Sequence, residues 1–339
     1  MGQQTIAFLM DPYETLNLAT ETSLLLIDEL ITRGHDVFWL EADDLVLRNN
    51  TVELNLRKVV STAPFHLEPM VYGQTAEELD ALVVRVDPPF NQNYLHLTYL
   101  LEFLPKSVLQ INSPTALREC NEKLLTLQFP EFCPPTIVTS HRPAIEKFAK
   151  ELGKIIVKPL EDCSGRGIAV IDPRRNLDHQ LDAALANFQE NAFVMAQAFL
   201  PGVARGDKRI FLVDGVPIGA VNRIPRTPTS LANIHQGAIC ERTDITDREH
   251  HICEQVGAEL SQRNVLLAGL DFIDGYLTEV NITSPSAVRQ INEVTGGRLE
   301  TAIVDHLLAK LQTRSRFEPG ALYTSHLGQG GFTEYSATP

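Results

Sequence analysis

The segment Ala268-Gly-Leu-Asp-Phe-Ile-Asp-Gly-Tyr-Leu-Thr-Glu-Val-Asn281 places three oxygen-bearing side chains, Asp271, Glu279 and Asn281, among otherwise apolar residues. Apolar runs on both sides of Asp274-Gly275 predict a hairpin of two strands. Glu279 and Asn281 are two residues apart, and they therefore lie on one face of their strand.

The length of the hairpin loop decides where Asp271 points. If the loop comprises Asp274, Gly275 and Tyr276, Asp271 pairs with Glu279 and the three oxygen-bearing side chains converge. A two-residue loop would instead turn Asp271 to the opposite face. Carboxylate and amide oxygens suit Mg²⁺ shared with substrate phosphates. The alternative is a solvated hairpin face, which the spacing favours less.

A lysine interrupts the apolar strand predicted over Lys154-Ile-Ile-Val-Lys-Pro159. The polar loop Glu161-Asp-Cys-Ser-Gly-Arg-Gly167 follows it, and its backbone N–H groups are suited to close over a triphosphate. In this interpretation Lys158 faces bound phosphates. In the alternative, its aliphatic stem carries the ammonium to the surface and the loop is an ordinary hairpin turn.

Two further basic clusters accompany predicted strands. Asp207-Lys-Arg209 begins one strand, and Arg223 ends another. Arg223 would stabilise the charge that develops on a transferring phosphoryl group. Each cluster read singly is equally consistent with a surface salt bridge.

The N-terminal part alternates strands, predicted over 5–10, 35–40, 81–86 and 108–111, with a helix over 20–33. This alternation predicts a parallel sheet whose ligands gather at the carboxyl ends of the strands. Asp11, Arg85, Asp87 and Asn112 lie near such ends. Capping of turns is the alternative role for each.

From about Asn121 onward, strand–loop–strand patterns replace this alternation. Helices are predicted over 177–189, 247–263 and 297–314, and strands over 193–200, 208–213 and 216–221. The tail after Phe317 has no apolar periodicity, so we expect disorder there.

Composition limits the classes of function. A formal charge of −14 over 339 residues argues against nucleic acid as a partner. No apolar run reaches the roughly 20 residues of a membrane helix, and the N-terminus has no signal-peptide pattern. Five cysteines without CxxC spacing indicate reduced thiols, with no disulfide frame or zinc site. We therefore expect a cytoplasmic protein.

Several segments in a fixed order resemble bacterial glutathione synthetase, an ATP-grasp ligase, over about residues 5 to 313. The segments are Met10-Asp-Pro12, Arg85-Val-Asp-Pro-Pro-Phe90, Asn112-Ser-Pro-Thr-Ala-Leu-Arg-Glu-Cys-Asn-Glu-Lys123, Ile156-Val-Lys-Pro-Leu160, Met195-Ala-Gln-Ala-Phe-Leu-Pro201, Gly206-Asp-Lys-Arg209, Arg223-Ile-Pro225, Gly269-Leu-Asp271 and Leu277-Thr-Glu-Val-Asn-Ile-Thr-Ser-Pro285.

The resemblance implies an α/β chain with an ATP-grasp fold preceded by an N-terminal open parallel-sheet (pre-ATP-grasp) domain. The implied divisions are an N-terminal substrate domain (1–120), a small lid subdomain (121–203), a C-terminal catalytic subdomain (204–316) and a disordered tail (317–339).

The resemblance also implies roles for individual residues. The nucleotide-binding residues are Lys123, Lys158, Ser164, Gly165, Gly167, Gln197, Phe199, Leu200 and Asp207, with 197–200 at the adenine and Asp207 near the ribose. The substrate-binding residues are Asp11, Arg85, Asp87, Asn112, Ser284 and Arg289. The metal ligands are Asp271, Glu279 and Asn281. The catalytic residues are Arg223, Lys158 and Asn233.

The implied reaction phosphorylates a substrate carboxylate to an acyl phosphate, which an amine attacks to form a peptide bond, with release of ADP and phosphate. The cofactors would be ATP and Mg²⁺, with Mn²⁺ as the alternative metal. The partners would be a γ-glutamyl dipeptide and an amino acid, without nucleic acid or membrane, and we expect a homo-oligomer.

The sequence departs from the family pattern in two loops and at one further position. The phosphate loop, usually Asp-Gly-Met-Gly-Gly, is Glu161–Gly167 here and gains the cation Arg166. The substrate loop, usually Arg-Gly-Asn-Leu-Ala-Ala-Gly-Gly, is Thr229–Gly237, with His235-Gln236 in place of two small residues. Val86 stands where the family often has Lys.

Three functions are consistent with these residues. The first is synthesis of glutathione from γ-glutamylcysteine and glycine. The second is a related ligase with another amino-acid acceptor or γ-glutamyl donor, which the changed loop allows. The third is a non-catalytic ATP-binding regulatory protein. The intact set of lysines and metal ligands argues against the third.

Overall fold

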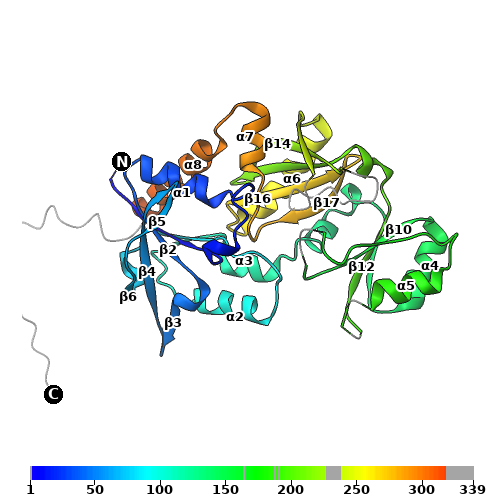
Figure 1. The fold of residues 1–339 in the computed structure, drawn as a ribbon, viewed down its shortest axis with the longest axis horizontal. Helices are drawn as coiled ribbons and strands as arrows, with labels where there is room; N and C mark the ends of the chain where they lie inside the picture. The colour runs from blue at the N-terminus through cyan, green and yellow to red at the C-terminus, as the bar shows by residue number, and fades with distance from the viewer. Residues whose placement is uncertain (1, 163–164, 187, 190, 227–237, 318–339) are drawn as a thin grey trace, which may run out of the picture.

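The computed structural model describes residues 2–162, 165–186, 188, 189, 191–226 and 238–317, with side chains described as far as 313. Within these residues the strands form three sheets. Figure 1 shows one sheet at each end of the molecule and the third between them. Ser164, Asn233, the loop over 229–237 and the tail over 318–339 lie outside the described residues.

The first sheet contains the parallel strands that the sequence predicts, in the order β2-β1-β7-β8. Its strands are β1 (Thr5–Leu9), β2 (Asp36–Leu40), β3 (Leu45–Arg48), β4 (Thr51–Thr62), β5 (Phe65–Leu67), β6 (Val71–Thr75), β7 (Ala81–Val84) and β8 (Leu109–Ile111). Its helices are α1 (Ser23–Thr32), α2 (Gln92–Leu101) and α3 (Pro114–Glu119).

The sheet is mixed, because residues 45–75, for which the sequence predicts no strand, add an antiparallel part to it. There the long strand β4 pairs antiparallel with β2, β3, β5 and β6. Residues in its first half alternate between buried and partly exposed positions, the pattern of an antiparallel strand with one covered face.

The second sheet is antiparallel, with strand order β11-β10-β12-β9. Its strands are β9 (Thr136–Thr139), β10 (Ile155–Pro159), β11 (Ala169–Ile171) and β12 (Val194–Ala198), and its helices are α4 (Arg142–Leu152) and α5 (Leu177–Leu185). These elements enclose a separate core of Ile145, Ile155, Val157, Leu181 and their neighbours.

The third sheet has strand order β15-β14-β13-β16-β17, and its neighbouring strands are antiparallel. Its strands are β13 (Asp207–Val213), β14 (Val216–Ile224), β15 (Ile239–Arg242), β16 (Leu267–Ile273) and β17 (Tyr276–Asn281). The helices are α6 (Asp247–Gln262), α7 (Val288–Thr295) and α8 (Leu299–Phe317).

The first and third sheets share their apolar cores. One cluster joins Leu82 and Leu101 to Leu270, and another joins Phe8 and Ile27 to residues of α8. Helix α8 packs on α1, and Arg33 of the α1 end pairs with Asp305 at 2.6 Å. The chain therefore returns at its end to the N-terminal sheet, and the antiparallel second sheet stands apart (Figure 1).

The hairpin of β16 and β17 has a two-residue turn, so the alternative with Tyr276 in the loop is wrong. Asp274 and Gly275 both have positive φ, 52° and 73°, and Tyr276 already pairs with Ile273. A bulge then shifts the register between Asp271 and Phe272, because Thr278 adds one residue to β17. Asp271 consequently pairs with Glu279, as the convergence of the oxygens requires.

The described cysteines, Cys120, Cys133, Cys240 and Cys253, are free thiols. Among the described helices, none has the length and apolar character needed to cross a bilayer.

Candidate active site

One face of the third sheet carries the charged residues. Arg209 of β13 pairs in register with Asp271 of β16, which pairs with Glu279 of β17. Asp207 and Arg223 are likewise opposite each other on β13 and β14. Residues opposite one another in antiparallel strands share a face, and residues two apart do so as well. The register therefore gathers these side chains, with Asn281, on one surface.

Asp271 is the centre of this surface. Arg209 donates to both of its carboxylate oxygens, at 2.7 and 2.6 Å, and Arg223 Nη2 lies 3.0 Å from Oδ1. Burial alone would raise the pKa of Asp271, but the two guanidinium groups hold it below its usual value. The two arginines therefore favour the anionic form of Asp271.

Arg223 also pairs with Asp207, at 2.8 Å, and it donates from Nε to the Asp207 carbonyl. Burial would lower the pKa of Arg223, and the two aspartates outweigh it and raise the pKa. Burial raises the pKa of Asp207 to about 7 against the opposing effect of Arg223. Arg223 and Arg209 are both buried, which excludes surface salt bridges for them.

Asn281 and Glu279 complete the oxygen-bearing face. Asn281 Nδ2 lies 3.3 Å from Asp271 Oδ2 and 3.3 Å from the Gly269 carbonyl. The contact orients the Asn281 amide with its nitrogen toward Asp271. Glu279 is half-buried on the same face.

Lys158 of β10 is only 5% exposed, so its stem does not carry the ammonium to the surface. Burial lowers its pKa, Glu279 opposes that effect, and the nearby ammonium of Lys123 lowers the pKa further. No residue within the described ranges accepts a hydrogen bond from its ammonium. A buried cation in this state is suited to receive an anionic ligand.

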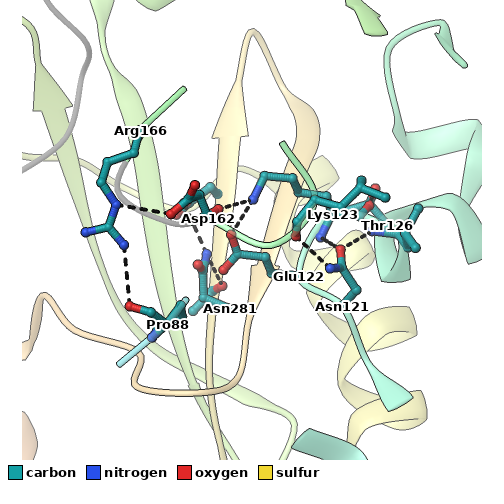
Figure 2. Close-up of polar contacts among 12 residues, drawn as sticks. Pro88, Asn121, Glu122, Lys123, Thr126, Asp162, Arg166 and Asn281 are labelled. Carbon is teal, nitrogen blue, oxygen red and sulfur yellow. Dashed lines mark hydrogen bonds and ion pairs between the residues drawn. The ribbon is translucent and has the colours of Figure 1, made fainter. Parts of the chain in front are cut away.

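The segment 121–123 connects the second and third sheets. Val280 N donates to the Glu122 carbonyl at 2.9 Å, and Asn121 Nδ2 donates to the Leu160 carbonyl at 2.7 Å. Lys123 Nζ lies 2.5 Å from Glu122 Oε1 and 2.6 Å from the Asp162 carbonyl (Figure 2). Lys123 thus lies where the phosphate loop begins, beside the face that carries Asn281.

Glu122 was missed from the sequence, although it precedes Lys123 directly. Burial and the charge of Glu279 raise its pKa to about 7, opposed by Lys123 and Arg209. Arg209 was also given no role of its own. Arg209 is two residues from Asp207, and this spacing, which places both side chains on one face of β13, is the feature of the sequence that indicates its place in the site.

The residues expected at the adenine lie on β12 and just after it. Gln197 is buried and donates from Nε2 to Thr136 Oγ1 at 3.0 Å. Phe199 lies under the ammonium of Lys154, 4.9 Å from the ring centroid, and Leu200 follows.

In the phosphate loop, Gly165 and Gly167 have φ of 76° and 71°, which disfavours other residues there.

Arg85 lies at the end of β7 and is buried. Its Nε donates to Ser23 Oγ at 2.9 Å, and its Nη2 donates to the Pro285 carbonyl at 3.0 Å. Its Nη1 has no hydrogen-bond partner among the described residues, and neither has the buried Nε of Arg289 on α7. Two unsatisfied guanidinium N–H groups are suited to the carboxylates of a substrate.

Asp11 and Asp87 lie together at the neighbouring strand ends. Asp87 N donates to Asp11 Oδ2 at 2.9 Å. Burial raises the pKa of Asp11, and the charge of Asp87 adds to that effect. Ser284 is half-buried, close to the Pro285 carbonyl that Arg85 contacts.

Asn112 has a structural role, and the substrate contact expected for it stays a prediction. Its amide nitrogen donates to the carbonyls of Leu267 and Ile282, at 2.8 and 2.6 Å. Its oxygen accepts from the N–H groups of Leu266 and Leu267. All four hydrogen-bonding positions of the amide are filled. Asn112 therefore fastens the first sheet to the third.

The donor set fits Mg²⁺ bound together with a nucleotide. Asp271, Glu279 and Asn281 supply hard oxygen atoms at one place, and Lys158 and Lys123 supply cations beside them. In the described part of the chain, three or more His, Cys, Asp or Glu side chains are nowhere gathered as a metal site. Phosphate oxygens would therefore have to complete the coordination shell.

The fold is that of the ATP-grasp ligases. It is similar to the crystal structure of the D-cycloserine synthetase DcsG, with a TM-score of 0.63 and 15% identity over 90% of this chain and 99% of that one. It is similar as well to the ATP-grasp ligase PsnB complexed with minimal precursor, Mg and ADP, with a TM-score of 0.59 and 15% identity over 91% and 98% of the two chains.

Sequence comparison identifies the family. Residues 5–118 match the N-terminal domain of prokaryotic glutathione synthetase, and residues 122–296 match its ATP-grasp domain. The chain is 37% identical to glutathione synthetase of Coxiella burnetii, over 91% of this chain and 96% of that one. It is 35% identical to that of Brucella melitensis, over 90% and 98%. The chain belongs to the prokaryotic glutathione synthetase family.

Proposed function

We propose that the protein joins γ-glutamylcysteine to glycine and forms glutathione, with ATP converted to ADP and phosphate. The observation that carries this proposal is the position of Lys158, a buried ammonium beside the oxygen ligands Asp271 and Glu279. A buried cation for which no described residue is an acceptor, next to a face of hard oxygen ligands, is the arrangement that a metal-bound triphosphate needs. Family membership supports the choice of substrates.

The nucleotide would lie between the second and third sheets. Lys158 and Lys123 would contact its phosphates, Gly165 and Gly167 would let the loop backbone approach them, and residues 197–200 would line the adenine. Asp207, which is paired with Arg223, would lie near the ribose. Asp271, Glu279 and Asn281 would hold Mg²⁺, or Mn²⁺ in its place. The metal would neutralise charge on the transferring phosphoryl group.

The dipeptide would lie at the carboxyl ends of the first sheet. Arg85 and Arg289 would bind carboxylates through the N–H groups for which the described residues offer no acceptor. Asp11 and Asp87 would face its ammonium group, and Ser284 would contact its backbone.

Chemistry would begin when the carboxylate of the cysteine residue attacks the γ-phosphorus of ATP, with ADP as the leaving group. Arg223 would stabilise the charge on the transferring group. The amine of glycine would then attack the acyl phosphate and lose a proton as the C–N bond forms, and phosphate would leave. Asn233, which lies outside the described residues, would contact the intermediate.

A second candidate is a ligase of the same mechanism with another acceptor. The altered segment Thr229–Gly237 favours it, because His235-Gln236 replaces two small residues of the family pattern.

We further propose that the chain divides into the domains 1–120, 121–203 and 204–316 and the tail 317–339. We also propose a homo-oligomeric state and a cytoplasmic location. The limits of the two family matches support the division near 120.

A phosphate-release assay with γ-glutamylcysteine and a panel of amino acids tests the choice of acceptor. Glycine should give the highest kcat/KM. A higher kcat/KM with a larger amino acid would support the second candidate. Absence of phosphate release with every acceptor would contradict both.

A further inference from the structure

Glu122 is a buried carboxylate to which neither the family resemblance nor the expected reaction gives a role. Its backbone is already fixed, because Val280 N donates to its carbonyl and Asn121 Oδ1 accepts from the N–H groups of Lys123 and Leu124. The Glu122 side chain is therefore not needed to hold the segment in place.

The carboxylate of Glu122 contacts the ammonium of Lys123, with Oε1 and Nζ 2.5 Å apart. The Glu122 side chain is 12% exposed and that of Lys123 is 3% exposed. Figure 2 shows Glu122 beside Asn281, with Lys123 extending on toward Asp162. The pair thus lies between the metal-ligand face and the start of the phosphate loop.

The charges around this pair explain why a carboxylate is placed there. Lys123 and Lys158 are close enough that Lys123 lowers the pKa of Lys158. Two ammonium groups brought together in a buried site repel each other and lose hydration. Glu122 offsets the charge of Lys123 and orients the Lys123 side chain. A buried Glu–Lys pair contributes little net stability, because desolvation of the two charges offsets their attraction. The presence of the pair is therefore consistent with a role in the site.

We propose that Glu122 is a positioning residue of the ligase reaction, which holds the Lys123 ammonium at the point where ATP phosphates bind. The inference rests on the proposed function, because it takes Lys123 as a phosphate contact. Glu122 itself touches no substrate in this account. It acts through Lys123, whose ammonium would keep the Asp162 carbonyl as an acceptor but lose the carboxylate that helps fix its position.

Glu122→Gln keeps the shape of the side chain and removes its charge. Affinity for a non-hydrolysable ATP analogue with Mg²⁺, measured by titration calorimetry, should fall about tenfold, the size typical of one coupled contact. The KM for ATP should rise in parallel, and the KM for γ-glutamylcysteine should stay the same. Glu122→Asp, which keeps the charge, should recover part of the affinity.

The double variant Glu122→Gln, Lys123→Met separates positioning from a direct effect of the carboxylate. If Glu122 acts through Lys123, the double variant binds the analogue as Lys123→Met alone does. It also removes the ammonium together with the carboxylate, so it remains informative if Glu122→Gln alone does not fold. Additive losses would overturn the proposal.

Glu249→Gln is the matched control, because Glu249 is buried and pairs with Lys208 at 2.8 Å in the third sheet. This variant should melt at a lower temperature and bind the analogue as wild type does. Unchanged or tighter binding by Glu122→Gln would overturn the proposal. Wild-type protein that binds the analogue but makes no peptide bond would contradict the proposed function, whereas a loss of affinity in Glu122→Gln would still show that Glu122 positions Lys123 for the phosphates.

Discussion

Arg209 holds the Asp271 carboxylate by both oxygens, with donor–acceptor distances of 2.7 and 2.6 Å across paired positions of β13 and β16. A two-point contact of this kind fixes the plane of the carboxylate as well as its position. The proposed metal ligand is thus oriented before any metal binds. The same contact makes the stability of the protein depend on the charge of Asp271.

Asp271→Asn should abolish peptide-bond formation and also lower stability. Arg209 and Arg223 would both face a neutral amide, and breaking a buried charge contact of this kind costs about 3 kcal/mol. Thermal melting and turnover at saturating Mg²⁺ measure the two effects. Near-normal turnover would remove Asp271 from the metal site.

Glu279→Gln should abolish turnover with little change in melting temperature. Within the described residues, Glu279 has no ion pair or side-chain hydrogen bond that the change would break. Its loss should therefore appear in metal and nucleotide binding alone. A variant that turns over ATP at the wild-type rate with glycine and γ-glutamylcysteine would show that Glu279 is not a ligand.

Lys158→Met should leave the apo protein as stable as wild type or more stable. The change removes a buried ammonium, and no described residue accepts a hydrogen bond from that ammonium. The rise in melting temperature on addition of Mg-ATP should become much smaller. Lys208→Met is the control, since Lys208 has Glu249 as a partner and its loss should destabilise the apo protein. An equal ligand-induced shift in Lys158→Met and wild type would exclude the phosphate contact.

Arg85→Lys should raise the KM for γ-glutamylcysteine about tenfold, because lysine keeps the charge but loses the planar fork. ATP affinity should change little. Arg57→Lys serves as the control, because Arg57 pairs with Glu41 in the same sheet. If both variants have the same KM as wild type, Arg85 does not bind the dipeptide.

His35 should make the protein less stable in mild acid. Burial and the charge of Arg33 lower its pKa, and its Nδ1 accepts a hydrogen bond from Gln4 N, which requires a neutral nitrogen there. A histidine whose pKa is lower in the folded state stabilises above its unfolded pKa, about 6.5, and loses that contribution as pH falls through the folded value.

The measurement for His35 is the drop in melting temperature between pH 7 and pH 5. His35→Gln should show a smaller drop than wild type, since glutamine does not titrate. An identical drop in the two proteins would mean that His35 has no part in acid sensitivity.

The hairpin around Asp271 shows both what the sequence predicts about the site and what it does not predict. Period-two alternation correctly predicts that Glu279 and Asn281 share a face. It does not predict the bulge at Thr278, which brings Asp271 to that face despite a two-residue turn. A bulge depends on how β17 pairs with β16 and packs against distant segments, and the local sequence carries little of that information.

Other features of the site depend on contacts between distant segments. Asn112 has the position of a ligand at a strand end, but its amide is used by Leu266, Leu267 and Ile282, more than 150 residues away in the chain. Glu122 acquires its environment only when β17 pairs with its backbone. By contrast, Lys158 was identifiable because a lysine inside an apolar strand is anomalous by itself.

Direct detection of the product tests the central claim. Purified protein with Mg-ATP, γ-glutamylcysteine and glycine should produce the tripeptide glutathione by mass spectrometry, with one ADP formed for each peptide bond. Omission of any one of the substrates should abolish the product. ADP formation without a tripeptide, or a tripeptide that contains another amino acid in preference to glycine from an equimolar mixture, would contradict the assignment.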